Sequence, residues 1–230
     1  MTNLAENLEK VYSNMRAACE KSERNFSDVK LVAVTKTQDA ARVSELIALG
    51  VKDIGENRVQ EMVEKYPLIA KPNVNWHMIG HLQTNKVKNI VDKVSLIHSV
   101  ESCKLAKEID KQAKLCEKII EILVEINIAG EESKYGIEPG MLNAFLEEIA
   151  GLENIVVKGL MCMAPNVENP EENRLYFRKM RRMFVDSGSL SANNISMKYL
   201  SMGMTNDYAV AIEEGANIIR VGTGIFGPRS

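Results

Sequence analysis

A lysine at the end of the first strongly apolar segment is the side chain of this sequence best suited to covalent chemistry. Lys36 follows the run Leu31–Val34 and stands between two threonines. A strand that ends beneath a ligand cleft holds a lysine amine partly out of water, and desolvation lowers the pKa of an ammonium group. An unprotonated amine attacks an aldehyde to form a Schiff base. Because most strand-end lysines are solvated surface charges, Lys36 is a candidate nucleophile only if other residues form a site around it.

Two glycine-containing segments near the end of the sequence have the composition of an anion site. They are residues 201–207 and 220–227, and each begins at the end of a short apolar run. Gly222 and Gly224 let the backbone approach an anion closely, and Ser201 and Thr223 carry hydroxyl groups that donate hydrogen bonds. An ordinary glycine turn explains either segment alone. The two together predict a phosphate site if the strands that carry them are neighbours.

Further polar residues accompany these segments. Arg220 lies between two apolar residues, so the alternation of a strand places its side chain on the face opposite to theirs. Its place beside a glycine loop favours an inward donor over a surface arginine. Asn57 follows another short apolar run, where its amide either contacts a ligand or forms a turn or helix cap. We expect Thr205 or Asn206 to cap the following helix, which would leave the helix N-terminus facing the anion.

The elements that must position these residues alternate along the whole sequence. Short apolar segments predict eight strands, at Leu31–Val34, Asp53–Gly55, Trp76–Ile79, Leu96–Ser99, Ile120–Ile128, Val156–Met161, Met197–Ser201 and Ile218–Val221. Apolar residues three or four apart predict helices at Ala40–Leu49, Arg58–Tyr66, Gln83–Val91, Ser102–Leu115, Pro139–Ile149, Pro170–Val185 and Asp207–Glu214.

Eight strand–helix units predict an α/β protein that is a single (β/α)8 TIM barrel over residues 1–230. The alternative is an open doubly wound sheet, but no G-x-G-x-x-G sequence follows the first strand. An extra amphipathic helix over residues 3–24 precedes the first strand, and we expect it to cover the N-terminal mouth of the barrel. In such a barrel the carboxyl ends of the strands meet at one mouth, so Lys36, Asn57 and Arg220 are predicted to lie together.

Composition and charge narrow the class of partner. The formal net charge is −2, so there is no basic excess to neutralise the phosphates of nucleic acid. Cysteines stand far apart at positions 19, 103, 116 and 162, which predicts reduced thiols in a cytoplasmic protein. No segment has the pattern of a secretory leader or the length of a membrane helix. We expect a cytoplasmic protein with neither nucleic acid nor membrane as partner.

A metal site is not predicted. His77 and His81 are four residues apart, but that spacing places two ligands on one face only in a helix. Gly80 lies between them in a strand–loop segment, and no carboxylate cluster completes a coordination sphere.

The segments that carry these residues resemble, in order and over nearly the whole chain, the pyridoxal phosphate (PLP) homeostasis family of YggS/PROSC-type PLP-binding proteins. The matching segments are Leu31–Thr37, Gly55–Glu61, Trp76–Lys86, Ser133–Gly136, Gly159–Met161, Ser201–Met204 and Arg220–Gly227.

The resemblance implies a fold-type III PLP barrel, similar to the N-terminal domain of alanine racemase. By position, it implies that Lys36 holds PLP as a Schiff base, that Asn57 lies beside the cofactor and that Arg220 faces the pyridine nitrogen. The phosphate-binding residues that it implies are Ser201, Gly203, Gly222 and Thr223.

An arginine against the pyridine nitrogen disfavours protonation of that nitrogen and makes the ring a weaker electron sink. Racemases that share this arrangement use an additional acid/base residue from a second domain, for which 230 residues leave no room. We therefore expect a non-catalytic, monomeric PLP-binding protein of intracellular PLP (vitamin B6) homeostasis, with PLP-dependent apoenzymes as possible recipients. One alternative is a PLP-dependent amino-acid racemase with His77, His81 or Tyr208 as acid/base group. The other is a cofactor-free Schiff-base aldolase acting on a phosphorylated sugar.

Overall fold

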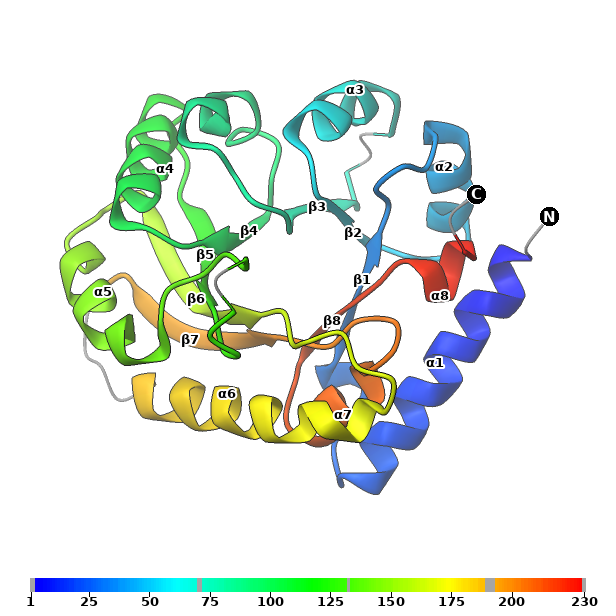
Figure 1. Ribbon diagram of the computed structural model, residues 1–230. Coiled ribbons are helices and arrows are strands. Elements are labelled where there is room, and N and C mark those ends of the chain that lie inside the picture. Colours follow the sequence, from blue (N-terminus) through cyan, green and yellow to red (C-terminus); the bar gives the residue numbers. More distant parts are fainter. Residues whose placement is uncertain (1–2, 70–71, 132, 189–192, 229–230) are drawn as a thin grey trace.

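The eight predicted strands form a closed parallel barrel in the computed structural model, which describes residues 3–69, 72–131, 133–188 and 193–228 (Figure 1). The strands follow one another around the barrel in sequence order, and the last pairs with the first. They are β1 (Lys30–Val34), β2 (Asp53–Glu56), β3 (Asn75–Met78), β4 (Leu96–Val100), β5 (Ile120–Ile126), β6 (Ile155–Cys162), β7 (Ile195–Ser201) and β8 (Ile218–Val221). The predicted (β/α)8 fold is confirmed.

Helices surround the barrel (Figure 1). They are α1 (Leu4–Lys21), α2 (Ala40–Ala48), α3 (Val59–Ile69), α4 (Cys103–Leu115), α5 (Leu142–Ile149), α6 (Arg174–Ser187), α7 (Tyr208–Glu213) and α8 (Thr223–Phe226), with 3-10 helices η1 (Phe26–Asp28), η2 (Thr84–Asn89), η3 (Pro139–Met141) and η4 (Pro170–Asn173). None of the helices in the described ranges is both long and apolar enough to cross a membrane.

The prediction of an α-helix over Gln83–Val91 is wrong, because this segment forms only the 3-10 helix η2. No side chain caps its first turn. Asn85 and Asn89 also have side chains that compete with the backbone for hydrogen bonds, which disfavours a longer helix. Val87 in this segment is buried. The apolar pattern therefore predicted the buried position correctly but not the type of helix.

Helix α1 does not cover the N-terminal mouth, as the sequence predicted, but lies outside the barrel against α7 and α8 (Figure 1). The reason is that α7 has six residues and α8 only four, so that they leave apolar surface beside them for α1 to cover. Two side-chain bonds fix the contact: Asn14 Nδ2 donates to the Tyr208 hydroxyl at 3.0 Å, and Asn7 Nδ2 donates to the Ile225 carbonyl at 2.9 Å. The buried stripe of α1 consists of Leu4, Leu8, Val11, Met15, Ala18 and Cys19.

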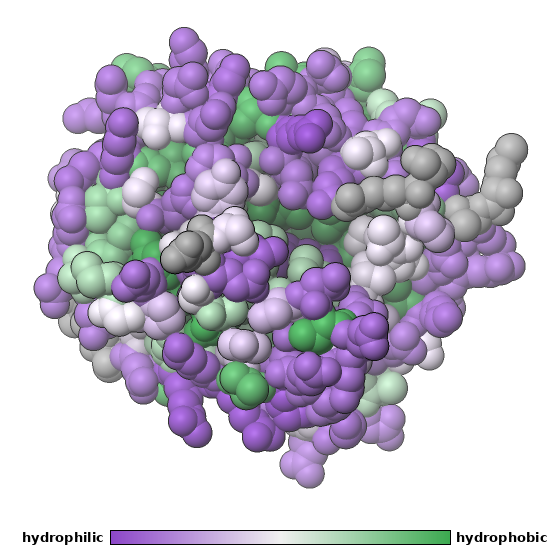
Figure 2. Space-filling model, viewed as in Figure 1, coloured by the Kyte–Doolittle hydropathy of each residue, from purple (hydrophilic) through white to green (hydrophobic). Residues whose placement is uncertain are grey.

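Apolar side chains form two cores. The larger one fills the space between the strands and the helices. The smaller one lies inside the barrel and consists of Val32, Val34, Ile79, Leu96, Leu123, Met161 and Ile218. From the side shown in Figure 1 the surface is mostly hydrophilic, with apolar side chains visible in the hollow near its middle (Figure 2).

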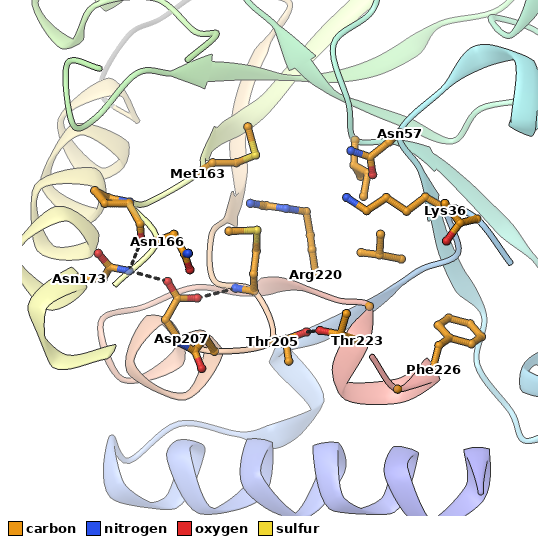
Figure 3. A pocket seen from close by; sticks show the side chains of 18 of the residues that line it. Lys36, Asn57, Met163, Asn166, Asn173, Thr205, Asp207, Arg220, Thr223 and Phe226 are labelled. Carbon is orange, nitrogen blue, oxygen red and sulfur yellow. Dashed lines mark hydrogen bonds between the residues drawn. The ribbon is translucent and has the colours of Figure 1, made fainter. Parts of the chain in front are cut away.

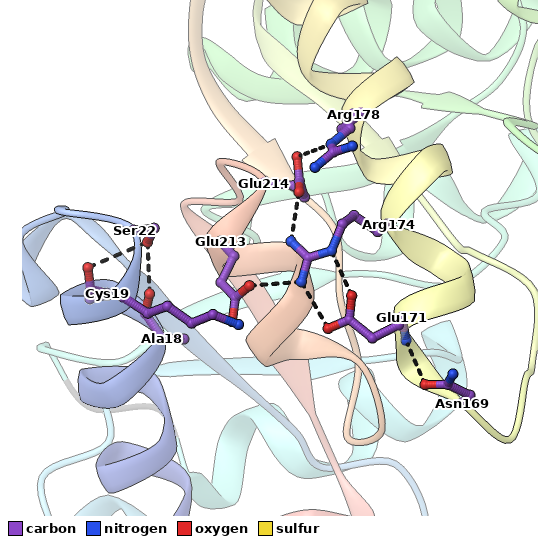
Figure 4. Close-up of polar contacts among 10 residues, drawn as sticks. Ala18, Cys19, Ser22, Asn169, Glu171, Arg174, Arg178, Glu213 and Glu214 are labelled. Carbon is purple, nitrogen blue, oxygen red and sulfur yellow. Dashed lines mark hydrogen bonds and ion pairs between the residues drawn. The ribbon is translucent and has the colours of Figure 1, made fainter.

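Arg174, the first residue of α6, joins three carboxylates (Figure 4). Its guanidinium contacts Glu171, Glu213 and Glu214, each at 2.7 Å. Glu213 also contacts Lys21 at 2.9 Å. The cluster therefore ties α6 and α7 together and connects both to α1.

Replacing Arg174 with alanine is expected to lower the free energy of unfolding by about 1 to 3 kcal/mol, because the largely buried Glu213 and Glu214 carboxylates lose a charged partner. The matched control is Arg16→Ala, which removes an exposed ion pair with Glu9. This substitution should change the free energy of unfolding by less than about 0.5 kcal/mol. Urea unfolding measures both values. Equal effects of the two substitutions would contradict the structural role of the cluster.

Candidate functional site

A cavity of about 480 Å³ opens at the carboxyl ends of β1, β2, β6, β7 and β8. Its walls bring together five of the seven residues predicted from the sequence, namely Lys36, Asn57, Arg220, Gly222 and Thr223. In Figure 3, Lys36 and Asn57 lie on one side of the cavity, Met163, Asn173 and Asp207 on the other, and Arg220 between them.

Lys36 stands two residues beyond the end of β1, in a turn. Its side chain is half-buried and extends into the cavity (Figure 3). The next residue, Thr37, has φ of 63°, a left-handed conformation that is costly for a β-branched side chain. The Thr37 N–H donates to Glu61 Oε2 at 2.7 Å, which helps to hold the turn in this conformation.

A buried lysine on α3 holds the other side of the same turn. Lys65 Nζ donates to the Thr35 carbonyl and to Glu56 Oε1, both at 2.8 Å, and it lies 3.3 Å from Glu61 Oε2. Thr35 Oγ1 also donates to Glu56 Oε1 at 2.6 Å. Burial raises the pKa of Glu56, while the hydrogen bonds from Lys65 and Thr35 act in the opposite direction. We call Thr35, Thr37, Glu56, Glu61 and Lys65 the turn network.

Asn57 comes directly after β2. A Cβ at Gly80 would overlap the backbone oxygen of Asn57, so only glycine lets the two loops approach this closely. The side-chain atom Asn57 Oδ1 is buried and has no hydrogen-bond partner within the described part of the chain. Because buried acceptors are normally hydrogen-bonded, an unpartnered acceptor on a cavity wall indicates that a bound ligand donates a hydrogen bond to it.

Arg220 points into the barrel, as its place beside a glycine loop predicted, and is 4% exposed. Its NH1 group donates to Ser201 Oγ at 2.6 Å and its NH2 group to the Cys162 carbonyl at 2.8 Å. Burial lowers the pKa of the Arg220 guanidinium from its ordinary value, and the nearby Cys162 and Glu125 oppose that shift.

The two glycine-containing segments meet beside Arg220, and a hydroxyl that the predicted site had left out joins them. Thr205 Oγ1 lies 3.2 Å from Thr223 Oγ1 and accepts the N–H of Gly224 at 3.2 Å (Figure 3). The expectation that Thr205 or Asn206 caps the next helix is wrong, because Asp207 occupies the cap position of α7. The sequence signal for Thr205 is its hydroxyl within a glycine-containing segment, which is compatible with a helix cap and with an anion contact alike.

Ser201 and Gly203 lie behind the cavity wall rather than on it. Ser201 is fully buried, and its hydroxyl lies between Arg220 and His98. Gly203 has φ of 91°, and a Cβ there would come within 2.6 Å of the Ala211 side chain. Their predicted phosphate contacts remain predictions, and each also has a structural role, in placing Arg220 or α7.

The three residues considered as acid/base groups do not line the cavity. His77 lies inside the barrel between Asp53 and His98. His81 contacts Glu101 at 3.0 Å and stacks on Tyr135. The Tyr208 hydroxyl accepts a hydrogen bond from α1. His77 and His81 also have different neighbours, and the described residues contain no group of three or more histidine, cysteine, aspartate or glutamate side chains placed to hold a metal.

Comparison with known proteins identifies the family. Residues 7–230 match the family described as alanine racemase, N-terminal domain. The chain is 43% identical over 228 residues to the pyridoxal phosphate homeostasis protein of Aquifex aeolicus, with 99% of each sequence covered. The chain belongs to the pyridoxal phosphate homeostasis family. The Escherichia coli protein of that name is 32% identical over 233 residues, with 100% of this chain and 98% of that protein covered.

Solved structures agree with this membership. PipY of Synechococcus elongatus with PLP bound superposes with a TM-score of 0.84 at 32% identity, covering 98% of this chain and 100% of PipY. Alanine racemase of Clostridium difficile has a TM-score of 0.73 at 16% identity, and the match covers 99% of this chain but only 57% of the racemase. The pyridoxal phosphate homeostasis family therefore shares the barrel fold with the racemase.

Removing the amine of the turn network, by Lys65→Met, is expected to lower the free energy of unfolding by about 3 to 5 kcal/mol, because it leaves the buried Glu56 carboxylate without its counter-charge. The double variant Glu56→Gln/Lys65→Met should recover more than half of this loss, since no charge is then stranded. Urea unfolding of the parent, of the single variants Glu56→Gln and Lys65→Met, and of the double variant gives the coupling energy between the two residues. Additive losses would show that the pair is not coupled.

A buried carboxyl on β5 makes stability depend on pH. Glu125 is 3% exposed, and burial, with the charge of Glu101, raises its pKa to about 7, against the effect of Arg220. The folded state therefore binds this proton more tightly than the unfolded state. The stability that Glu125 contributes is full below its ordinary pKa of 4.5 and is lost as the pH rises through about 7.

Glu125→Gln should consequently gain stability relative to the parent protein as the pH rises from 4.5 to 8, by about 3 kcal/mol at 1.36 kcal/mol for each pKa unit. Urea unfolding midpoints at both pH values measure the difference. Glu121→Gln, a control on the same strand with a 41% exposed side chain, should show little change. A parallel pH dependence of the Glu125 variant and its parent would refute the assignment.

Proposed function

We propose that this protein binds PLP in the cavity at the carboxyl ends of the strands and serves intracellular PLP homeostasis without catalysing a reaction. The observation that carries the proposal is the convergence of Lys36, Arg220 and the Gly222–Thr223 loop on one cavity. These groups match the three functional groups of PLP. An amine reacts with the aldehyde, a guanidinium donates to the pyridine nitrogen, and a glycine-containing loop binds the phosphate. The family relatives carry the name of this function, and the PipY structure contains the cofactor.

The residues present fit the cofactor. Lys36 would hold it covalently, since a primary amine and an aldehyde form a Schiff base with loss of water. Gly222 and Thr223, together with Thr205, would hold the phosphate. The unpartnered Asn57 Oδ1 is a ready acceptor for a donor on the ligand. When bound, PLP supplies an electron sink, and its strength depends on the group that faces the ring nitrogen.

The charges on the cavity wall support binding without catalysis. Arg220 is cationic and disfavours protonation of a ring nitrogen beside it, which weakens the electron sink. Besides Lys36 and Arg220, Asp207 is the one ionisable side chain among the described wall residues. Its two oxygens already accept hydrogen bonds, from the Met204 N–H at 2.7 Å and from Asn173 Nδ2 at 2.8 Å. Amino-acid chemistry on PLP needs a second positioned acid/base group, which this wall does not offer.

We further propose that the protein acts in the cytoplasm as a monomer and passes PLP to apoenzymes that depend on it. Its four cysteines are free thiols, which suits a reducing compartment. The cavity opens at a barrel mouth, so the cofactor has a route in and out.

After incubation with PLP and removal of excess, the purified protein should show the near-visible absorption band of a Schiff base, and Lys36→Ala should abolish it. Lys88→Ala, which changes an exposed lysine of η2, should keep the band at full intensity. Borohydride reduction followed by mass spectrometry should then find a pyridoxyl group on Lys36. A phosphorylated-sugar adduct in its place would favour the aldolase alternative, and absence of any band would refute PLP binding.

A further inference from the structure

A continuous chain of side-chain hydrogen bonds crosses the inside of the barrel and ends at Arg220. It begins at Asp53, the first residue of β2, where Oδ1 lies 3.0 Å from His77 Nε2. His77 Nδ1 lies 2.9 Å from His98 Nε2, and His98 Nδ1 lies 3.0 Å from Ser201 Oγ. Ser201 Oγ then accepts the 2.6 Å bond from Arg220 NH1. The members come from β2, β3, β4, β7 and β8.

The two ends of this chain determine where each proton lies. Arg220 can only donate, so the Ser201 oxygen accepts from it and its own O–H turns to His98 Nδ1. The Asp53 carboxylate can only accept, so His77 donates to it through Nε2–H. A neutral imidazole carries one N–H, and both ends therefore place the protons of His77 and His98 on Nε2.

The surroundings favour these charge states. Burial lowers the pKa of His77, and it lowers the pKa of His98 well below its ordinary value, with the positive charge of Arg220 adding to the shift. Burial alone would raise the pKa of Asp53, but the hydrogen bond from His77 and the ammonium of Lys30, at 3.2 Å, lower this pKa. Neutral histidines between a carboxylate and a guanidinium are thus the stable arrangement.

Such a chain is costly unless it is complete. Branched apolar side chains usually fill the inside of a (β/α)8 barrel. A polar group buried there loses its hydration, and without a hydrogen-bond partner this loss is not compensated. His98 and Ser201 are fully buried, yet each ring nitrogen of His98 and the Ser201 hydroxyl has a partner. Complete hydrogen-bond networks of this kind make the geometry of their members rigid.

We propose that Asp53, His77, His98 and Ser201 are positioning residues, which fix the direction of the Arg220 guanidinium so that it can donate to the pyridine nitrogen of the cofactor. The proposal deepens the proposed PLP function and rests on it. It also assigns Ser201 a role distinct from the phosphate contact that the family resemblance implies, and the two roles give different results with a cofactor analogue.

The first experiment needs no cofactor. The sequence contains three histidines, so long-range ¹H–¹⁵N correlation spectra of the apoprotein resolve all six ring nitrogens. His77 and His98 should both show the neutral Nε2–H tautomer at neutral pH. Asp53→Asn should keep it, because the amide oxygen still accepts, whereas Asp53→Ala should release it. An Nδ1–H tautomer on either residue of the parent protein would overturn the chain.

The second experiment compares PLP with its 1-deaza analogue, in which C–H replaces the ring nitrogen. The parent protein should bind PLP about 10 to 100 times more tightly, the value of one hydrogen bond to a charged group. Ser201→Ala and Asp53→Ala should reduce this preference to within about threefold while the affinity for the analogue hardly changes. Arg220→Met shows the ratio of the two affinities when the guanidinium donor is absent. His81→Gln is the matched histidine control and should keep the full preference for PLP.

The outcomes separate the two proposals. If Ser201 instead contacts the phosphate, Ser201→Ala weakens both ligands equally, and the positioning role is overturned. An unchanged preference in Ser201→Ala and Asp53→Ala also overturns it. Failure of the parent protein to bind either ligand would refute the PLP function itself, and the tautomers of the apoprotein would still decide whether the chain exists.

Discussion

The ion pair between Glu56 and Lys65 is the constraint on which the geometry of the site depends. Both groups are buried, so their attraction must offset the loss of hydration, and a pair of this kind is stable only with further hydrogen bonds. Those bonds come from Thr35, whose carbonyl and hydroxyl both contact the pair. The backbone next to Lys36 is thereby fixed from within the protein. A long, flexible lysine side chain is held at its base, where control of its direction costs the least entropy.

Closure of the barrel supplies the rest of the site. β1 pairs with β8 in a register that sets Val32 beside Arg220 and Ala33 beside Val221. The ends of the first and the last strands are therefore neighbours, although nearly the whole sequence separates Lys36 from Gly222. Because the strands are parallel, their carboxyl ends share one mouth. The Gly222–Thr223 loop and the Lys36 amine meet only if the barrel closes, which ties the integrity of the cavity to the stability of the whole fold.

The sequence was sufficient for what depends on local pattern. Strand order, the inward direction of Arg220 and the strand-end position of Lys36 follow from periodicity and from the rules for parallel barrels. Periodicity states which face is buried but not which element covers it, so α1 was assigned to the wrong surface. The role of Lys65 could not be predicted either, because a lysine on a helix is normally solvated. Its i, i+4 spacing from Glu61 was the one local indication of an ion pair.

Polar residues at inward strand positions were the least predictable part of the molecule, since their meaning lies in partners from distant strands. His98 is adjacent in space to Ser201, 103 positions further along the chain, and no local pattern expresses that contact. The same arrangement bears on the proposal that this barrel binds a cofactor without catalysing a reaction. In the proposed arrangement, the chain would hold the Arg220 guanidinium in one direction beside the ring nitrogen, where a cation disfavours protonation of that nitrogen. Catalysis by PLP profits from a ring that accepts electron density, so an arginine held in this way would suit the proposed role of binding the cofactor better than catalysis.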